Sequence, residues 1–115
     1  MNGEFYDTLP AHVQSRMLEV LNQNPDNPHH CIAGGSPTYD KVFLLSIDEA
    51  MRYFTGNDDR AAEHEGAGGR WWLRSPGAAV FYAVYVCCDG NVDTHGSHVD
   101  FGADFGVRPA LWLRL

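Results

Sequence analysis

Residues 71–106 read WWLRSPGAAVFYAVYVCCDGNVDTHGSHVDFGADFG, and this stretch carries the clearest strand and turn signals in the chain. The pair Asp89-Gly90 stands between two valine-bearing runs, which predicts a β-hairpin. A three-residue loop over 88–90, with Gly90 in the left-handed conformation, places Val86 opposite Val92. A two-residue loop would put these valines on opposite faces of the sheet. We therefore expect the longer loop.

The same register divides the hairpin residues between two faces. Val84 then pairs with Thr94, and the valines of both strands point into the core. Beside the loop residue Cys88, the alternate positions point outward: Tyr85, Cys87, Asp93 and His95. These outward positions can vary without unfolding the sheet.

The stretch Gly77–Gly106 uses a restricted set of residue types. It contains no Lys, Glu, Gln, Met or Trp, whereas these types supply 14 of the other 85 residues. Uniform usage would place about five of them in a stretch of this length. The missing types are those that a codon of the form any-any-pyrimidine cannot encode. Because strands and turns also deplete Glu, Lys and Met, composition alone leaves two interpretations open: a diversified surface on a fixed frame, or a glycine-rich β-meander.

Length and charge limit the class of protein. A chain of 115 residues with 44% hydrophobic residues is expected to form one domain with a modest core. Its net charge of −7 argues against nucleic acid or a membrane surface as a partner, because both need a basic face. The sequence has no apolar run of about 18 residues and no signal-peptide pattern, so we expect no direct membrane insertion and leave the location open.

The N-terminal half is expected to hold one helix and a long loop. Thr8 and Pro10 are typical of a helix start, and an apolar face continues from Val13 to Leu21. Asparagine, proline, glycine and serine then predict a loop over 22–39.

Further elements are expected on both sides of the tryptophan pair. We expect a strand over 41–45, and a capping box of Ser46 and Glu49 predicts a second helix through 54. A polar loop is expected over 57–69, and a closing strand over 107–115. The three tryptophans, Trp71, Trp72 and Trp112, are expected in the core because of their large apolar area.

Candidate catalytic groups are weak in this sequence. His95 and His98 with Asp93 and Asp100 resemble a zinc donor set, but on a varied face we interpret this as chance. The adjacent Cys87 and Cys88 are expected to point to opposite faces, so we assign them no catalytic role. No nucleophile with a base and an orienting group is recognisable. We therefore expect no catalytic residue, no metal and no cofactor.

Two arginines flank the varied stretch, in the motifs RSPG and VRPA. Arg74 and Arg108 each carry five donors in a fixed fork, which suits tying loops to carbonyl or carboxylate groups. We expect both to be structural rather than ligand-binding.

Four motifs together resemble an uncharacterised bacterial domain family: NGEFY, VFLLSIDEA, WWLRSPG and GVRPALWL. Members of this family include the variable proteins of diversity-generating retroelements, in which adenines of a template repeat are miscopied. The resemblance implies an α+β, C-type-lectin-like fold related to that of formylglycine-generating enzymes, with two short helices and a small antiparallel sheet. It also implies a first strand before NGEFY, which we expect this chain to lack. The edge of 110–115 would then be unpaired and would favour self-association.

The resemblance further implies which positions vary, within a hypervariable region over 78–105. An Asn codon miscopied at its adenines becomes any codon that ends in a pyrimidine. The variable positions carried over in this way are Ala79, Val80, Phe81, Tyr82, Tyr85, Cys87, Cys88, Asp93, Thr94, His95, Ser97, His98, Asp100, Phe101, Asp104 and Phe105.

These observations favour binding over catalysis. We expect a non-enzymatic recognition domain whose partner is a protein or another macromolecule, with aromatic side chains as anchors. Calcium-dependent sugar binding is not implied, because neither Glu-Pro-Asn nor Gln-Pro-Asp occurs. Two alternatives stay open: an enzyme of the formylglycine-generating architecture that uses cysteine or metal chemistry, and a structural module of a larger surface or phage protein.

Overall fold

The structure is a computed structural model, and it describes residues 3–28, 30, 32–64, 67–79, 81–100 and 105–114. It is an α+β fold with short helices and mostly antiparallel strands, as expected. The elements in chain order are α1 (Gly3–Thr8), α2 (Ala11–Gln14), β1 (Val20–Asn22), β2 (Thr38–Asp40), α3 (Ile47–Tyr53), α4 (Asn57–Arg60), β3 (Ala62–His64), β4 (Ala67–Pro76), β5 (Tyr82–Val86), β6 (Val92–His98) and β7 (Phe105–Gly106).

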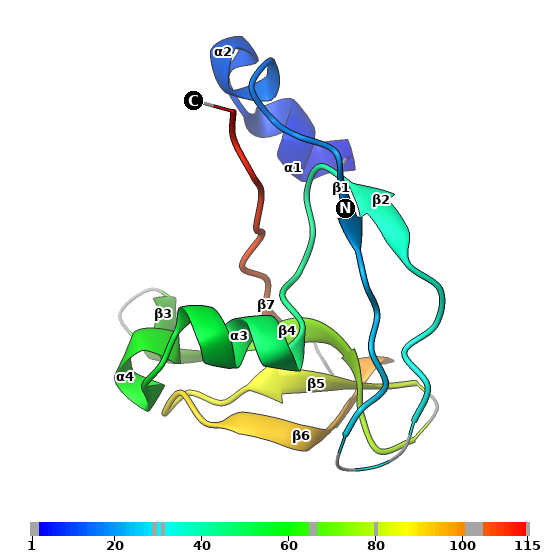
Figure 1. The fold of residues 1–115 in the computed structure, drawn as a ribbon. Coiled ribbons are helices and arrows are strands. Elements are labelled where there is room, and N and C mark those ends of the chain that lie inside the picture. The colour runs from blue at the N-terminus through cyan, green and yellow to red at the C-terminus, as the bar shows by residue number, and fades with distance from the viewer. Residues whose placement is uncertain are drawn as a thin grey trace.

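The main sheet has the strand order β3-β4-β5-β6, and β7 pairs with β4 in parallel. Helices α3 and α4 lie over one face of this sheet, while α1, α2 and the small β1–β2 sheet lie apart from it (Figure 1). We call the opposite face, which neither α3 nor α4 covers, the outer face. Among the described residues, no helix is long and apolar enough to cross a bilayer.

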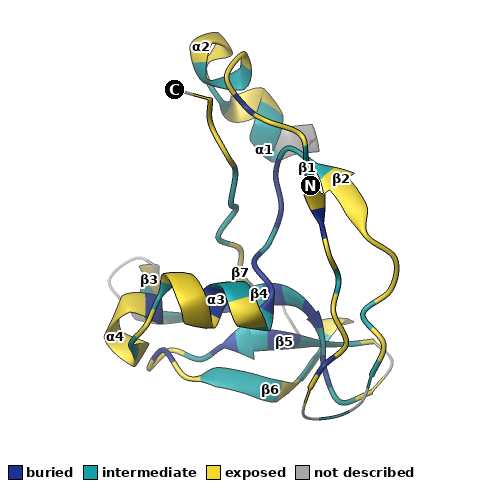
Figure 2. Cartoon of the chain, viewed as in Figure 1, coloured by how far each residue is buried: buried dark blue, intermediate teal, exposed yellow. Residues whose placement is uncertain are grey.

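The core lies between α3 and the sheet (Figure 2). Strands β4 and β5 contribute alternate residues to it, because successive side chains of a strand point to opposite faces. Ala50 on the buried side of α3 packs against these strands, and the segment before α3 adds two more apolar side chains. The buried cluster consists of Phe43, Leu45, Ala50, Trp71, Leu73, Val84 and Val86.

The hairpin turn has the predicted geometry. Val86 pairs with Val92, and Gly90 has a φ of 88°. The amide of Gly90 donates to the Cys87 carbonyl at 2.9 Å, and the amide of Cys87 donates to the Asn91 carbonyl at 2.7 Å. The three-residue loop over 88–90 is therefore confirmed.

Further from the turn, the expected pairing of Val84 with Thr94 is wrong. Tyr85 pairs with Asp93, but the next pair is Ala83 with Ser97, so the register shifts between them. Gly96, which has a φ of 81°, lies at this shift. A Cβ at Gly96 would lie 2.4 Å from the Ala83 carbonyl oxygen, so the close approach of the two strands depends on glycine.

The capping box before α3 is confirmed. The Ser46 hydroxyl accepts from the Glu49 amide at 3.2 Å, and the Glu49 carboxylate accepts from the Ser46 amide at 3.0 Å. Helix α3 then ends at Tyr53, close to the predicted end.

The N-terminal prediction is wrong in its second half. Helix α2 ends at Gln14, and β1 instead forms an antiparallel pair with β2. Thr8 does not cap a helix start, because its hydroxyl donates to the Phe5 carbonyl at 2.6 Å. The apolar pattern of 13–21 is compatible with a strand as well as with a helix. Pairing of β1 with the distant residues 38–40 outweighs the local preference for a helix.

Two other segments also differ from expectation. The segment 57–69, predicted as a loop, contains α4, β3 and the start of β4. The segment 41–45, predicted as a strand, forms no named strand but an isolated bridge from Phe43 to Ala110, and the side chains at 42, 43 and 45 are buried.

Only one of the three tryptophans lies in the core. Trp71 is 2% exposed, whereas Trp72 is half-buried because the adjacent position on β4 points to the other face. Trp112 is 50% exposed and lies in an extended segment.

The edge of the closing strand was expected to be unpaired. This expectation is wrong for one of the two edges, which makes backbone hydrogen bonds with earlier segments. Ala110 exchanges two backbone hydrogen bonds with Phe43, at 3.0 and 2.8 Å. The Trp112 carbonyl accepts from Leu18 at 2.9 Å, and the Arg114 amide donates to the Arg16 carbonyl at 2.7 Å. Segments earlier in the chain therefore pair with this edge, although no strand longer than isolated bridges results.

The inward and outward positions of the hairpin predict opposite effects of substitution. Val86→Asp should lower the free energy of unfolding by about 3 kcal/mol or more, because Val86 is fully buried and the new carboxylate would have no partner. His95→Ala should lower it by about half a kcal/mol or less, because His95 is exposed. Urea unfolding of both variants measures the difference, and equal losses would contradict the assignment.

Candidate ligand-binding face

Three aromatic side chains form a platform on the outer face, and we call Trp72, Tyr85 and Phe105 the aromatic platform. Trp72 pairs with Tyr85 across β4 and β5, which places both on the same face. Phe105 on β7 stacks on Trp72 with ring centroids 4.2 Å apart and meets Tyr85 edge-on at 4.9 Å. The guanidinium of Arg70 lies 5.6 Å from the centre of the Phe105 ring. The platform thus combines apolar area with one cation.

A second group of rings surrounds Tyr82, and we call Tyr82, His95 and His98 the histidine cluster. Tyr82 meets His95 edge-on at 5.7 Å and His98 at 5.8 Å. Phe81 lies 6.0 Å from His98, and the loop residue His30 lies 5.6 Å from His95. Residues from β5, β6 and the loop before β2 therefore meet at the end of the hairpin that lies away from its turn.

Phe81 is presented to solvent in an unusual backbone conformation. Its side chain is 69% exposed, and its φ is 67°, in the left-handed region that a bulky residue rarely adopts. Its carbonyl accepts from the Val99 amide at 2.9 Å, which holds the turn against the end of β6. Strain of this kind persists where the surrounding structure enforces it, often at binding sites.

A hydrogen bond fixes the platform's only hydroxyl. The Tyr85 hydroxyl donates to the Asp93 carboxylate at 2.9 Å, and the same carboxylate accepts from the Gly96 amide at 3.1 Å. Burial raises the pKa of Tyr85 above its ordinary value, and the hydrogen bond and negative charge of Asp93 raise it further. The hydroxyl therefore stays protonated at neutral pH and holds the Asp93 side chain in place.

The tip of the hairpin carries two thiols and a carboxylate. Cys87 is half-buried, Cys88 is exposed, and both are free. The exposed Asp89 carboxylate accepts from the Asn91 amide at 3.0 Å and from its side chain at 2.7 Å, and these bonds lower the pKa of Asp89. The carboxylate thus closes the turn.

The variable positions that the structure describes all lie outside the buried core. Val80, Phe101 and Asp104 lie outside the described residues. No other member of the set is buried: Ala79, Phe81, Cys88, His95 and Asp100 are exposed, and Tyr82, Tyr85, Cys87, Asp93, Thr94, Ser97, His98 and Phe105 are half-buried.

Thr94, a member of the set, lies on the helix side of the sheet. Thr94 lines a cleft with Ile47 and Met51, which belong to α3 on that side of the sheet. Thr94 follows Val92 by two residues, so strand alternation places both on this side, as the predicted hairpin register implied. Among the described residues, no group of three or more His, Cys, Asp or Glu side chains is arranged to hold a metal ion.

Sequence reasoning missed the residue that anchors the hairpin, which is Arg60. Its side chain is 5% exposed and donates through Nε to the Gly90 carbonyl at 2.9 Å. Its terminal nitrogens donate to the Phe54 carbonyl and to the Asn57 side chain. The only signal in the sequence is a single arginine within an acidic segment, which predicts an exposed loop rather than a buried cation.

The Arg60 backbone continues this network into the core. Its carbonyl accepts from the Trp71 indole at 3.0 Å and from Arg108 at 3.1 Å. Arg108 also stacks over the rings of Trp71 and Phe54, at 4.6 and 4.9 Å. The structural role expected for Arg108 is confirmed.

Asn27 was also missed, since it lies in a stretch predicted as loop. It is 1% exposed, and its side-chain amide donates to the Pro76 and Thr94 carbonyls, both at 2.8 Å. Nearby, Gly77 approaches His95 so closely that a Cβ would lie 2.6 Å from the His95 carbonyl oxygen. Asn27 therefore joins β4 to β6 at the end of the hairpin opposite Arg60.

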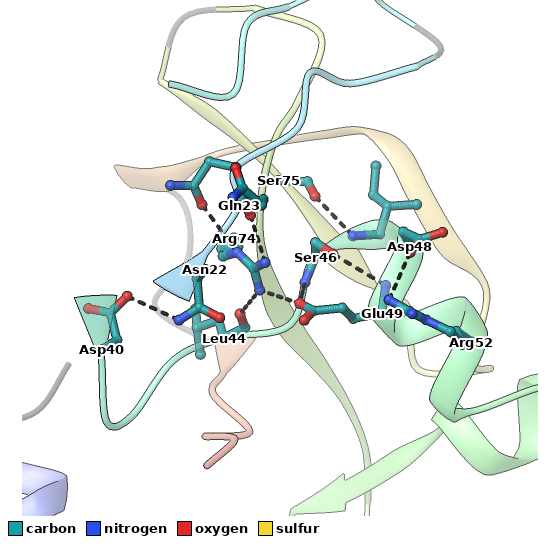
Figure 3. A network of polar contacts seen from close by, with 12 residues as sticks. Asn22, Gln23, Asp40, Leu44, Ser46, Asp48, Glu49, Arg52, Arg74 and Ser75 are labelled. Carbon is teal, nitrogen blue, oxygen red and sulfur yellow. Dashed lines mark hydrogen bonds and ion pairs between the residues drawn. The ribbon is translucent and has the colours of Figure 1, made fainter. Parts of the chain in front are cut away.

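Arg74 has the structural role expected for it (Figure 3). It forms an ion pair with Glu49, the capping residue of α3, and donates to the carbonyls of Leu44 and Gln23, both at 2.8 Å. Its Nε also donates to the Asn24 side chain at 3.2 Å. It thereby ties β4 to α3 and to the segment after β1, on the side of the sheet away from the aromatic platform.

A protein-family model described as a domain of unknown function, DUF6273, matches residues 1–115. Neither the curated proteins nor the solved structures give a match to this chain.

The buried network predicts that two arginines differ greatly in importance. Arg60→Ala should lower the free energy of unfolding by about 3 kcal/mol, because it leaves buried acceptors at Gly90 and Phe54 without a donor. The control, Arg52→Ala, removes an exposed pair with Asp48 and should cost about 0.5 kcal/mol or less. Thermal and urea unfolding measure both losses, and a small loss for Arg60→Ala would refute the anchoring role.

Proposed function

Since the chain belongs to the DUF6273 family, we propose its function from the site itself: a non-enzymatic recognition domain that binds a protein or another macromolecular ligand. The ligand would contact the aromatic platform, the histidine cluster and the hairpin tip. The observation that carries this proposal is the division along β5, where Val84 and Val86 are fully buried, whereas the variable positions Tyr82 and Tyr85 are only half-buried and Phe81 just before the strand is exposed.

The composition of the outer face supports binding. Aromatic side chains give a large contact area at a small cost in side-chain entropy, and they are enriched among residues that dominate binding energy. Phe81 is the most exposed of them in the hairpin region and would act as an anchor. Asp93 lies beside the aromatic platform, and the carboxylates of Asp89 and Asp100 are exposed near the two ends of the hairpin, which would favour a ligand with positive charge.

Rigidity of the hairpin also supports binding. Arg60 and Asn27 hold its two ends, and the Tyr85–Asp93 hydrogen bond restrains its middle. A surface that is already ordered loses less conformational entropy when a ligand binds. Side-chain changes on such a frame would alter the ligand without altering the fold.

The proposal also covers the fold and the genetic origin of the variable residues. We propose that the domain has a C-type-lectin-like fold, related to that of formylglycine-generating enzymes, and that a diversity-generating retroelement writes its variable positions. The support is the absence of Lys, Glu, Gln, Met and Trp from Gly77–Gly106, which adenine miscopying of Asn codons would produce.

The enzymatic alternative gains no support from the two hairpin thiols. An activated thiol needs a neighbouring base or cation. Within the described part of the chain, neither Cys87 nor Cys88 forms a side-chain hydrogen bond with an acidic or basic group.

Photo-crosslinking in the source cells tests the proposal. A benzophenone amino acid in place of Phe81 should form a covalent adduct with the ligand, because this side chain would lie within the contact. Tyr39 is a matched control, since it is an aromatic residue of similar exposure, 67% against 69%, on the separate β1–β2 sheet. Equal adducts from both positions, or none from Phe81, would contradict the proposed binding face.

A further inference from the structure

The closing segment, which we define as residues 107–114, has one paired edge and one open edge. Ala110, Trp112 and Arg114 direct their backbone groups to the edge that pairs with Phe43 and with residues 16–18. Leu111 and Leu113 direct theirs to the opposite edge, because successive residues of an extended chain alternate. Within the described residues, no hydrogen bond reaches the amide or carbonyl groups of these two leucines.

The open edge is flanked by exposed apolar side chains. Trp112 is 50% exposed, Leu113 is 40% exposed, and Tyr53 at the end of α3 is 48% exposed. Tyr53 and Trp112 meet edge-on at 6.5 Å, and a groove lined by Phe43, Phe54 and other apolar residues runs beside them. An open strand edge with apolar neighbours is a template for pairing with another strand.

We propose that this edge pairs with the same edge of a second copy of the chain, in an antiparallel, two-fold symmetric dimer. The open groups lie at Leu111 and Leu113, at equal distances on either side of Trp112. A two-fold axis at Trp112 therefore sets Leu111 of one copy opposite Leu113 of the other, and all the open groups of both leucines find partners. A foreign strand would need no such symmetry.

The side chains are compatible with this register. Trp112 would face Trp112 of the second copy as a non-hydrogen-bonded pair, in which side chains approach most closely and aromatic pairs are favourable. Arg114 would lie opposite Ala110, so no like charges meet. Pro109 has no amide hydrogen and would end the pairing on its side. The pairing is short, so we expect a weak dimer whose population depends on concentration.

The dimer would leave the proposed ligand-binding face free. The open edge lies beside Tyr53 of α3, and α3 covers the sheet face opposite the aromatic platform. Two copies of the face would then be joined in one particle, which raises the effective affinity for a ligand with repeated sites. The dimer itself does not depend on the recognition function.

Sedimentation equilibrium of the full chain over a wide concentration range tests the proposal. The mean mass should rise from 12.8 kDa toward twice that value. Trp112→Glu should raise the dissociation constant at least about tenfold, because it places like charges opposite each other. Tyr39→Glu, at an exposed aromatic residue of β2, should leave the constant unchanged.

A cysteine cross-link keeps the test valid even if Trp112→Glu fails to fold. Trp112→Cys, with Cys31, Cys87 and Cys88 replaced by serine, should form a disulfide-linked dimer on oxidation, because non-hydrogen-bonded partners lie about 4.5 Å apart between Cα atoms. Tyr39→Cys in the same background should not. A chain that stays monomeric, or a dimer that neither Trp112 substitution affects or captures, would overturn the proposal.

Discussion

The buried guanidinium of Arg60 is the interaction on which the rest of the sheet depends. It lies under the hairpin, bonds to Gly90 at the turn, and reaches back to the carbonyl after α3. Its own carbonyl receives the indole of Trp71, the largest side chain of the core. Removing a cation from water is costly unless its donors are satisfied, and here backbone and amide oxygens satisfy them. The backbone of α4 also approaches the turn closely. A Cβ at Gly90 would lie 1.8 Å from the Asn57 carbonyl oxygen, so the turn requires glycine for this reason as well as for its positive φ.

This anchoring separates the fold from the surface it presents. The helix side of the sheet holds the apolar core and the polar network of Arg60, while the other side carries the aromatic platform. Asn27 performs the same task at the far end, where it joins β4 and β6 through their carbonyls. Because the frame depends mainly on buried groups, the outward side chains are free to serve recognition.

Local patterns in the sequence predicted those parts of the fold that are determined locally. The hairpin loop follows from Asp89-Gly90 and its valines, and the start of α3 follows from Ser46 and Glu49. The failures involve distant partners: Val20–Asn22 becomes a strand because Thr38–Asp40 pairs with it. In the candidate site, too, local patterns predicted some residues and missed others. Alternation along β5 predicted the outward position of Tyr85, but Arg60 and Asn27 act through contacts with residues far along the chain, which no local pattern reveals.

The proposal that a fixed frame presents a varied binding surface can be tested by sequencing the gene and its adjoining DNA across many isolates of the source population. We expect substitutions concentrated at positions such as Phe81, Tyr85 and His95, with Arg60 and the buried valines of β5 unchanged. We also expect a reverse-transcriptase gene beside a near-copy of the segment, with adenines at the varied codons. Substitutions spread evenly over frame and surface, without such a near-copy, would contradict the proposal.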